Sequence, residues 1–282
     1  TSFLTFQATI YNFFINFILT IECHIHSSVY APAKTCKNLY GNRKLMSLVK
    51  HRIKKNNQII YKYFIAKIIN LKIKSCFSIS KDSYKIANDY LGIDIKKNKI
   101  LTLGTDIELF YPSEKKDFNF KEDIGFNKND IVCIYTGRFD KSKKPHLLSQ
   151  ALIKLKDRGF CNLKGLFIGA GTAEYTNLLK NPCTVVLPFV DYKDLPKYYR
   201  IADIAVWPNQ ESTSQLDALA SGLPLILNHK TGTPERVEEC GYLFKDDSED
   251  DLADKIQILI DEEIRSKLSK KAVIKAHKNY SW

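Results

Sequence analysis

The fold class is decided by residues 207–227, whose sequence is Trp207-Pro-Asn-Gln-Glu-Ser-Thr-Ser-Gln-Leu-Asp-Ala-Leu-Ala-Ser-Gly-Leu-Pro-Leu-Ile-Leu227. An apolar strand ends here, a polar loop follows, Asp217 lies near the start of a small-residue helix, and Gly222 ends that helix before another apolar strand. In α/β proteins this order presents backbone N–H groups to a phosphate. Acidic Glu211 and Asp217 flank three hydroxyl residues, which are Ser212, Thr213 and Ser214. Because a bare helix start does not need this combination, we interpret the stretch as part of a nucleotide site.

Short apolar segments recur on both sides of this stretch and alternate with helical patterns. The predicted strands cover 131–135, 163–168, 184–187, 204–207 and 225–227. Apolar strands without polar alternation, separated by helices, are typical of a parallel sheet covered on both faces. Earlier in the chain, the pattern predicts a strand end at 21–26, a helix over 45–71, strands at 76–80 and 100–103, and a helix capped by Ser80 or Asp82. The sequence therefore predicts an α/β fold.

The chain has 282 residues, enough for two domains with sizeable cores. A polar segment at 111–130, rich in Lys and Asp, is the best candidate for the boundary. We expect an N-terminal domain over 1–112 and a C-terminal domain over 113–282. The first 21 residues carry no charge, but seven of them are Thr, Gln or Asn. This composition favours a buried helix and strand over a membrane span.

Positive charge is concentrated in one segment. The net charge is +12, and 13 Lys and Arg lie between Cys23 and Lys81, where Asp and Glu are absent; subtracting 13 from +12 leaves −1 for the rest. Such a segment can bind nucleic acid, an anionic membrane or an acidic substrate, or it can be a solvated helix face. The seven Cys are scattered without a C-x-x-C pair. This argues against a disulfide framework or a zinc site and favours the cytoplasm.

Two glycine-containing loops follow predicted strands. The loop after 131–135 carries Gly137, Arg138 and Lys143, and the loop after 163–168 carries Gly169 and Gly171. Loops after parallel strands meet at the carboxyl edge, where open α/β sheets bind ligands. Arg offers a planar fork to phosphate oxygens, and Lys offers a compact charge. The alternatives are a turn with two solvated cations in the first loop and a purely structural glycine pair in the second.

Together these loops resemble those of a known family. In chain order the motifs are Gly137-Arg138 with Lys143, Leu166-Phe-Ile-Gly-Ala-Gly171, Phe189-Val with Leu195-Pro-Lys-Tyr-Tyr-Arg-Ile-Ala-Asp203, Asp217-Ala-Leu-Ala-Ser-Gly-Leu-Pro224 and Gly232-Thr-Pro-Glu235. They are similar to motifs of retaining glycosyltransferases of family 4, which have the GT-B fold of two Rossmann-like domains facing across a cleft. The resemblance is specific over 131–244, with a weaker echo over 76–112. It implies an incomplete first domain in a chain truncated at both ends.

The resemblance implies roles for individual residues. In the family, the Arg and Lys of the first loop hold the donor diphosphate, and they correspond to Arg138 and Lys143. The family glutamate that binds the ribose hydroxyls corresponds to Asp217, and the backbone that contacts the base corresponds to Phe189 and Val190. Further phosphate contacts are expected from Ser212, Thr213 and Ser214.

Two assignments fit the family pattern only with a shift. The family spaces two acids eight residues apart, but Asn209 stands eight residues before Asp217. We take Glu211, six residues before Asp217, as the shifted counterpart near the transferred sugar. The first-domain histidine of the family follows a strand, so His26 is the candidate catalytic histidine and His24 is the second choice. A structural histidine is the alternative.

We expect a retaining glycosyltransferase of the hexosyltransferase type that moves a sugar from a nucleotide-diphosphate sugar to a glycan or lipid-linked acceptor in cell-surface polysaccharide synthesis. Because cations and helix N-termini can hold the diphosphate, neither a metal nor a cofactor is expected. The expected location is the cytoplasm, and an anionic inner membrane surface stays open as a partner. A nucleotide-sugar epimerase of related fold and a non-catalytic nucleotide-sugar-binding protein are the alternatives. Nucleic acid is not expected as a partner, because the basic segment lacks an interleaved aromatic platform.

Overall fold

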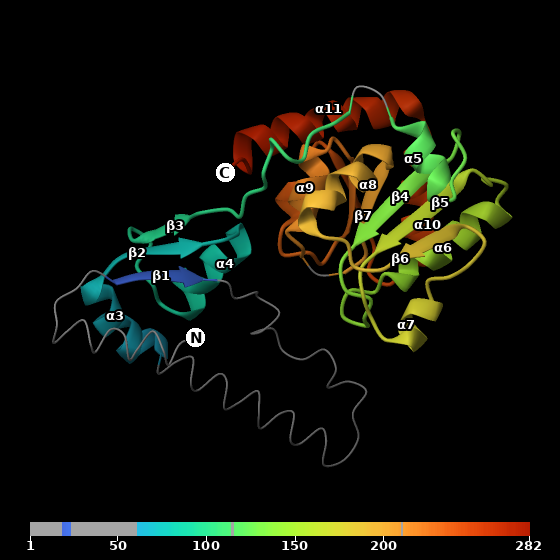
Figure 1. Cartoon of the computed structure of the whole chain (residues 1–282). Helices are drawn as coiled ribbons and strands as arrows, with labels where there is room; N and C mark the ends of the chain where they lie inside the picture. The colour runs from blue at the N-terminus through green and yellow to red at the C-terminus, as the bar shows by residue number, and fades with distance from the viewer. Residues whose placement is uncertain (1–18, 24–60, 114–115, 210) are drawn as a thin grey trace, which may run out of the picture. The chain divides into compact units, whose positions relative to one another are not determined.

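The computed structural model describes residues 19–23, 61–113, 116–209 and 211–282 (Figure 1). The chain divides into two compact units, Thr1–Thr102 and Leu103–Trp282. The predicted boundary lies ten residues later, after residue 112 instead of 102. The difference arises because Phe110 is fully buried in the second unit, where its ring centroid lies 5.0 Å from that of Tyr192 and 5.8 Å from that of Tyr199.

The described residues of the first unit form a parallel sheet of three strands in the order β1-β2-β3. Its elements are β1 (Leu19–Cys23), η3 (Tyr61–Ile65), α3 (Ala66–Lys72), β2 (Ile73–Ser78), α4 (Lys81–Lys85), η4 (Ile86–Tyr90) and β3 (Asn98–Ile100). Ser80 caps α4 by accepting a hydrogen bond from the Ser83 N–H over 3.1 Å, which confirms the first of the two predicted caps. The strands β2 and β3 begin slightly before their predicted starts, and the helix predicted over 45–71 is described only from residue 61.

The second unit is built on a six-stranded parallel sheet in the order β6-β5-β4-β7-β8-β9. The strands are β4 (Ile131–Thr136), β5 (Leu163–Ile168), β6 (Thr184–Leu187), β7 (Ile204–Trp207), β8 (Leu225–Asn228) and β9 (Gly241–Phe244). All strands predicted for this region are present, and the parallel α/β class is confirmed. The edge strand β9 is an element that the sequence pattern does not predict.

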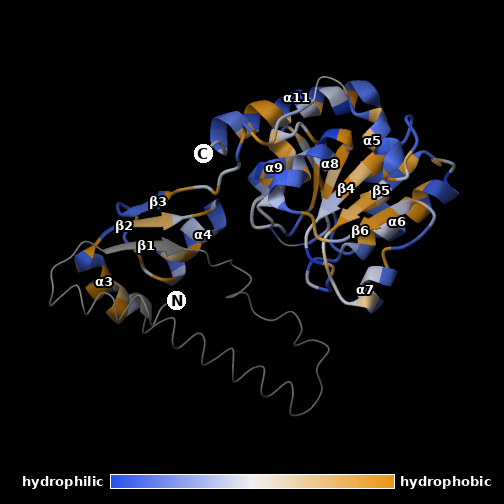
Figure 2. Cartoon of the chain, viewed as in Figure 1, coloured by the Kyte–Doolittle hydropathy of each residue, from blue (hydrophilic) through white to orange (hydrophobic). Residues whose placement is uncertain are grey.

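Helices cover both faces of this sheet (Figure 1). They are α5 (Phe118–Asp123), α6 (His146–Asp157), α7 (Ala173–Asn177), η5 (Tyr192–Asp194), α8 (Leu195–Ile201), α9 (Ser214–Ala220), η6 (Pro234–Arg236), α10 (Glu249–Ile258) and α11 (Glu262–Asn279). The helices α6 and α10 pack on each other over one face, and α9 and α11 pack on each other over the opposite face. Every residue of β4, β7 and β8 is buried, and Figure 2 shows the strands as the apolar centre of the unit. This core positions the loops at the sheet edge.

The chain changes its direction of progress across the sheet between β4 and β7. From β4 it moves outward through β5 to β6, and from β7 it moves outward the other way through β8 to β9. In an open parallel sheet, ligands bind in the crevice outside the carboxyl ends of the strands at such a switch point. The loops after β4 and β7 carry Arg138, Lys143 and Glu211. The topology therefore brings these predicted site residues to the edge where a ligand is expected.

Candidate functional site

The loop after β4 has a fixed backbone and leaves the Arg138 side chain exposed. Tyr135 donates a hydrogen bond to the Arg138 carbonyl over 2.8 Å, and the Phe139 N–H donates to the Ala170 carbonyl over 2.8 Å. The Arg138 side chain is 73% exposed, and its Nε lies 3.6 Å from a carboxylate oxygen of Asp140. Exposed ion pairs of this kind are weak. The guanidinium can therefore exchange Asp140 for an incoming phosphate.

Glycines allow the loops after β4 and β5 to touch backbone to backbone. Gly137 has a φ of 145°, and its N–H donates to the Ile168 carbonyl over 3.0 Å. A Cβ on Gly169 would overlap the Gly137 carbonyl, and a Cβ on Gly171 would overlap the Phe139 carbonyl. The predicted loop glycines thus have a structural role in this close approach, while a role in ligand binding stays a prediction.

The loop after β7 is tied to the loop after β4. Asn209 Nδ2 donates to the Ser142 carbonyl over 2.7 Å, and Lys143 Nζ donates to the Glu211 carbonyl over 2.8 Å. Burial lowers the pKa of Lys143, nearby Arg138 lowers it further, and Glu211 acts in the opposite sense. An anion bound between the two cations would relieve their repulsion. The structure therefore brings Arg138, Lys143 and Glu211 together in an arrangement that favours a bound anion.

The Glu211 carboxylate faces the loop after β8. Its Oε1 accepts hydrogen bonds from the Gly232 N–H and, over 3.3 Å, from Thr231 Oγ1. Gly232 begins the motif at 232–235 that the sequence singles out. These bonds join the loops after β7 and β8 into one wall of the site.

Arg236 is a site residue that the sequence pattern does not predict. It is only 5% exposed, and its Nη1 donates to the Ser212 carbonyl over 2.8 Å and to Gln215 Oε1 over 2.6 Å. Arg236 thereby holds the loop that carries the three hydroxyl residues. No local pattern marks it, because its two partners lie 24 and 21 residues away in the sequence.

Asp217 lies in α9, and its carboxylate is almost fully buried. Only 4% of the residue is exposed. Thr105 Oγ1 donates to Oδ1 over 2.6 Å, and the Tyr192 hydroxyl lies 3.5 Å from the same oxygen. Burial raises the pKa of Asp217 to about 6, against the effect of these two donors. At pH 7 the carboxylate is mostly ionised, so it can accept a hydrogen bond from a ligand hydroxyl.

The other predicted residues have varied surroundings. Phe189, after β6, is 72% exposed, whereas Val190 is partly buried against the core. Thr213 is exposed at the start of α9, and its side chain makes no capping hydrogen bond to that helix. His26 and His24 lie outside the described residues. The roles assigned to these side chains stay predictions.

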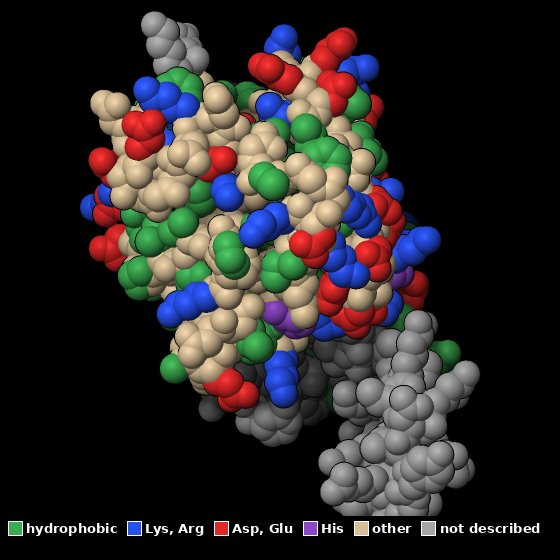
Figure 3. All heavy atoms as spheres, turned by 90° about the vertical axis from the view of Figure 1, so that its right-hand side faces the viewer, with side chains coloured by type: hydrophobic (Ala, Val, Ile, Leu, Met, Phe, Trp, Pro, Cys, Tyr) green, Lys and Arg blue, Asp and Glu red, His purple; other side chains and the backbone are tan. Residues whose placement is uncertain are grey.

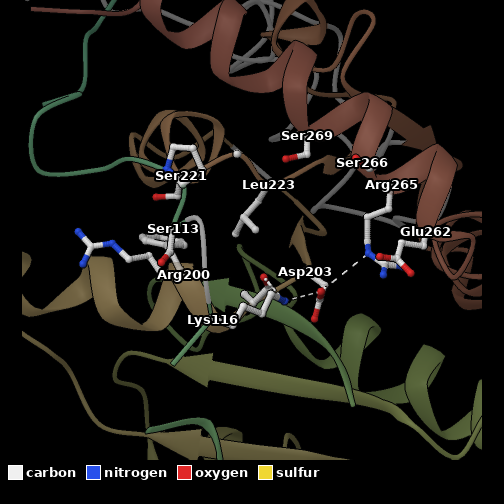
Figure 4. A pocket seen from close by; sticks show the side chains of 14 residues that line it. Ser113, Lys116, Arg200, Asp203, Ser221, Leu223, Glu262, Arg265, Ser266 and Ser269 are labelled. Carbon is white, nitrogen blue, oxygen red and sulfur yellow. Dashed lines mark hydrogen bonds and ion pairs between the residues drawn. The ribbon is translucent and has the colours of Figure 1, made fainter. Parts of the chain in front are cut away.

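A separate cavity of about 230 Å³ lies at the other edge of the sheet, near the amino ends of β4 and β7 (Figure 4). Asp203 joins its walls: its Oδ1 lies 2.5 Å from Lys116 Nζ and 3.8 Å from Arg265 Nε, and its Oδ2 accepts from the Val132 N–H over 2.9 Å. None of the predicted site residues in the described ranges lines this cavity. The charged side chains at its centre pair with one another, so they connect the end of α8 and the start of α11 to the sheet.

Comparison with known sequences identifies relatives of this chain. The sequence pattern of the family Glycosyl transferases group 1 matches residues 116–278, more than half of the chain. Spore coat protein SA of Bacillus subtilis is 28% identical over 228 residues, which are 69% of this chain and 60% of that protein. The chain thus spans less than two thirds of the length of this relative.

Solved structures with the same fold are also known. HepE of Anabaena in complex with UDP matches 100% of this chain and 73% of its own, with a TM-score of 0.73 and 18% identity. WaaG, a glycosyltransferase involved in lipopolysaccharide biosynthesis, matches 92% of this chain and 70% of its own, with a TM-score of 0.66 and 14% identity. These structural neighbours are GT-B glycosyltransferases, and the likeness confirms the predicted fold class.

Proposed function

Because the chain belongs to the family Glycosyl transferases group 1, we propose that it transfers a sugar from a nucleotide-diphosphate sugar to a glycan or lipid-linked acceptor, with retention of configuration at the anomeric carbon. One observation carries the proposal. Arg138, Lys143 and the loop of Glu211 meet outside the carboxyl ends of β4 and β7, at the switch point of the sheet. The UDP bound to HepE supports a uridine nucleotide as the first probe.

The main task of the proposed site is to stabilise a leaving diphosphate. As the sugar–phosphate bond breaks, negative charge grows on the phosphate oxygens, and fixed cations stabilise it more than they stabilise the ground state. Arg138 supplies an exposed planar fork, and Lys143 supplies a half-buried point charge. Glu211, oriented by the loop after β8, is the proposed contact of the transferred sugar.

Other residues have proposed roles around this centre. The proposed nucleoside contacts are Asp217, Phe189 and Val190. The proposed additional phosphate contacts are Ser212, Thr213 and Ser214. His26 is the proposed catalytic histidine of the first unit. We infer a surface glycan as the acceptor class, which the role of WaaG in lipopolysaccharide biosynthesis supports by analogy.

Nucleoside diphosphate binding is expected to need no divalent metal. Two cations already lie beside the proposed diphosphate position, and they supply the charge that a metal would otherwise contribute. Isothermal titration of UDP should give dissociation constants in EDTA and in Mg²⁺ that agree within about twofold. Loss of binding in EDTA would contradict the metal-free site. Failure of UDP, ADP and GDP to bind in either buffer would contradict the proposed function itself.

A labelled donor separates transfer from the two alternatives. A transferase moves the labelled sugar to an acceptor, or to water when no acceptor is present. An epimerase returns the label in a second nucleotide sugar, and a binding protein leaves the donor unchanged. We expect label to leave the nucleotide, with the anomeric configuration of the product equal to that of the donor.

We further propose that the basic segment Lys34–Lys81 rests on an anionic membrane surface, where a lipid-linked acceptor is presented. Its described part has exposed Lys67 and Lys74. Large apolar side chains are exposed on η3 and α3 beside them; they are Tyr63, Phe64, Ile68 and Leu71. Cationic and apolar side chains together match the polar and acyl layers of an anionic bilayer surface.

The second unit lacks such a concentration of positive charge. Figure 3 shows Lys and Arg side chains interspersed with Asp and Glu on one of its faces. Ion pairs join α6 to α10, with Lys154 Nζ 2.8 Å from Asp250 and Arg158 Nη1 2.7 Å from Asp254. Within the described ranges, no helix combines the length and the apolar character needed to cross a membrane. The proposed contact with lipid is therefore assigned to the basic segment.

Reversing two charges of the basic segment should weaken membrane binding. Lys67→Glu with Lys74→Glu is expected to lower co-sedimentation with phosphatidylglycerol vesicles at least about tenfold, because each Lys near an anionic surface contributes about 1 kcal/mol. Vesicles of phosphatidylcholine alone should bind neither protein. Lys156→Glu with Lys180→Glu makes the same charge change at exposed positions of the second unit and should bind like the parent. An equal loss of vesicle binding in both double variants would mean that binding depends only on net charge. The assignment of the membrane contact to the basic segment would then be wrong.

A further inference from the structure

We propose that Thr105 is a positioning residue for the nucleoside-binding carboxylate of Asp217. This inference rests on the proposed function, because it assumes that Asp217 binds ribose hydroxyls. The segment 103–111 begins the second unit, directly after the division of the chain at Thr102. Thr105 lies within the weaker family echo over 76–112, but that resemblance gives it no role in the site.

The first observation is the way in which Asp217 is held. Its two hydrogen bonds, from Thr105 over 2.6 Å and from Tyr192 over 3.5 Å, both reach Oδ1. Among the described residues, no hydrogen bond reaches Oδ2. One oxygen is therefore anchored, and the other is left to accept from a ligand through the 4% of the residue that is exposed. Since the Thr105 bond is short and has an ionised acceptor, it belongs to the stronger class of hydrogen bonds.

The second observation is that Thr105 itself has a fixed backbone. Its N–H donates to the Tyr280 carbonyl over 2.7 Å, and it forms a parallel bridge with Ser281. The neighbouring Gly104 packs so closely on the Trp282 ring that a Cβ would overlap it. Residues 280–282 thus serve as a support for Thr105. The hydroxyl of Thr105 is buried with the rest of the side chain, so it cannot turn to water instead.

The third observation is that the same segment also holds the second donor. Phe110 is fully buried, and its ring meets that of Tyr192 edge to face with a centroid distance of 5.0 Å. Thr105 and Phe110 therefore act on Asp217 from one continuous segment, the former directly and the latter through Tyr192.

The hydrogen bond from Thr105 also affects the protonation of the Asp217 carboxyl group. Burial raises the pKa of Asp217 to about 6, and the Thr105 and Tyr192 donors oppose that rise. The titratable groups coupled to Asp217 are the phenols of Tyr192 and Tyr199, whose own pKa values burial raises, so both remain protonated near neutral pH. Removing the Thr105 hydroxyl should raise the pKa of Asp217 further. A protonated Asp217 has one acceptor fewer for the ribose.

The test compares each nucleoside diphosphate with its 2′-deoxy counterpart. UDP and 2′-deoxy-UDP carry the same phosphates, so the ratio of their dissociation constants cancels the titration of the ligand. We define the ratio as the dissociation constant of 2′-deoxy-UDP divided by that of UDP. In the parent protein it should exceed one, and it should increase as the pH rises through about 6. Thr105→Val should reduce the ratio about tenfold at pH 7, the usual effect of losing a hydrogen bond to a charged group. The same substitution should also move the midpoint of the pH dependence of this ratio to a higher pH.

Three further variants make the result specific. Thr105→Ser keeps the hydroxyl and should restore both the ratio and the midpoint. Tyr192→Phe should have a smaller effect, since its hydroxyl is 3.5 Å away. Thr184→Val loses a hydrogen bond of 2.7 Å to the Leu179 carbonyl at the far end of β6, and it should leave the ratio unchanged. Thermal unfolding of each variant separates a positioning effect from a loss of fold.

The outcomes distinguish this inference from the function on which it rests. If the parent prefers UDP and Thr105→Val keeps both the preference and the midpoint, Thr105 does not position Asp217. A positioning role is equally contradicted if Thr184→Val changes the ratio as much as Thr105→Val does. If the parent binds none of UDP, ADP and GDP, the proposed function fails, and this inference fails with it.

Discussion

Replacing Arg138 with alanine is expected to lower turnover of the donor about a hundredfold. The guanidinium is 73% exposed and has only a weak ion pair with Asp140, so its removal leaves the loop after β4 intact. That loop is held instead by hydrogen bonds from Tyr135 and Phe139. Loss of one fixed donor to developing negative charge costs about 3 kcal/mol of transition-state stabilisation, which is about a hundredfold in rate. The measurement is kcat/KM for donor hydrolysis or transfer, with calorimetric binding of the product nucleotide in parallel.

The same loop provides a matched control. Lys141→Ala removes an exposed cation three residues from Arg138, and it should keep the parent rate. Lys143→Ala should lower kcat/KM for the donor as much as Arg138→Ala does or more, because Lys143 also donates a hydrogen bond to the Glu211 carbonyl over 2.8 Å. If Arg138→Ala turned over donor as fast as Lys141→Ala, the proposed diphosphate contact would be wrong.

Gly169→Ala is expected to destabilise the second unit by about 3 kcal/mol or more, which lowers its melting temperature by about 10 °C. The added Cβ would overlap the Gly137 carbonyl. That backbone cannot move aside easily, because the Gly137 N–H is bonded to the Ile168 carbonyl and Gly169 N–H to the Leu187 carbonyl. Thermal unfolding followed by circular dichroism measures the change.

Gly159→Ala is the matched control for this substitution. Both glycines have a positive φ, 157° at Gly169 and 97° at Gly159, but a Cβ on Gly159 would meet nothing within 4 Å. Its expected cost is only the backbone strain of about 1–2 kcal/mol. Equal melting temperatures for the two variants would show that the close approach of the two loops is not the reason for glycine at residue 169.

Much of the second unit could be predicted because its signals are local. The strands β4, β5, β6, β7 and β8 are short, mainly apolar segments, and each is present within one residue of its predicted limits. β9 was not predicted; it begins with Gly241, so its apolar run has only three residues, and a polar segment follows directly. The predicted domain boundary lies ten residues after the observed division because Phe110, just before the polar segment at 111–130, packs into the second unit.

The candidate site was partly predictable for the same reason. Arg138, Lys143 and Glu211 stand in loops directly after strands, and parallel topology carries such loops to one edge. The contacts that hold this arrangement were not predictable. Thr105 lies within the weaker family echo over 76–112, and Arg236 directly follows the motif at 232–235, but neither pattern gives these residues a role. Their partners are distant in the sequence: Arg236 reaches the Ser212 carbonyl from 24 residues away, and Thr105 reaches Asp217 from 112 residues away.

The sequence by itself determined the parallel α/β class, the order of the loops, and the residues in them that offer charge and hydroxyl groups, because these depend on runs of a few adjacent residues. Only the tertiary structure decided the environment of each group. It showed that Lys143 is bonded to a backbone carbonyl, that Gly169 is needed where two loops touch, and that Asp217 is buried beneath Thr105 with a raised pKa. Burial and hydrogen bonding are set by atoms that are distant along the chain, so no local stretch of sequence contains them.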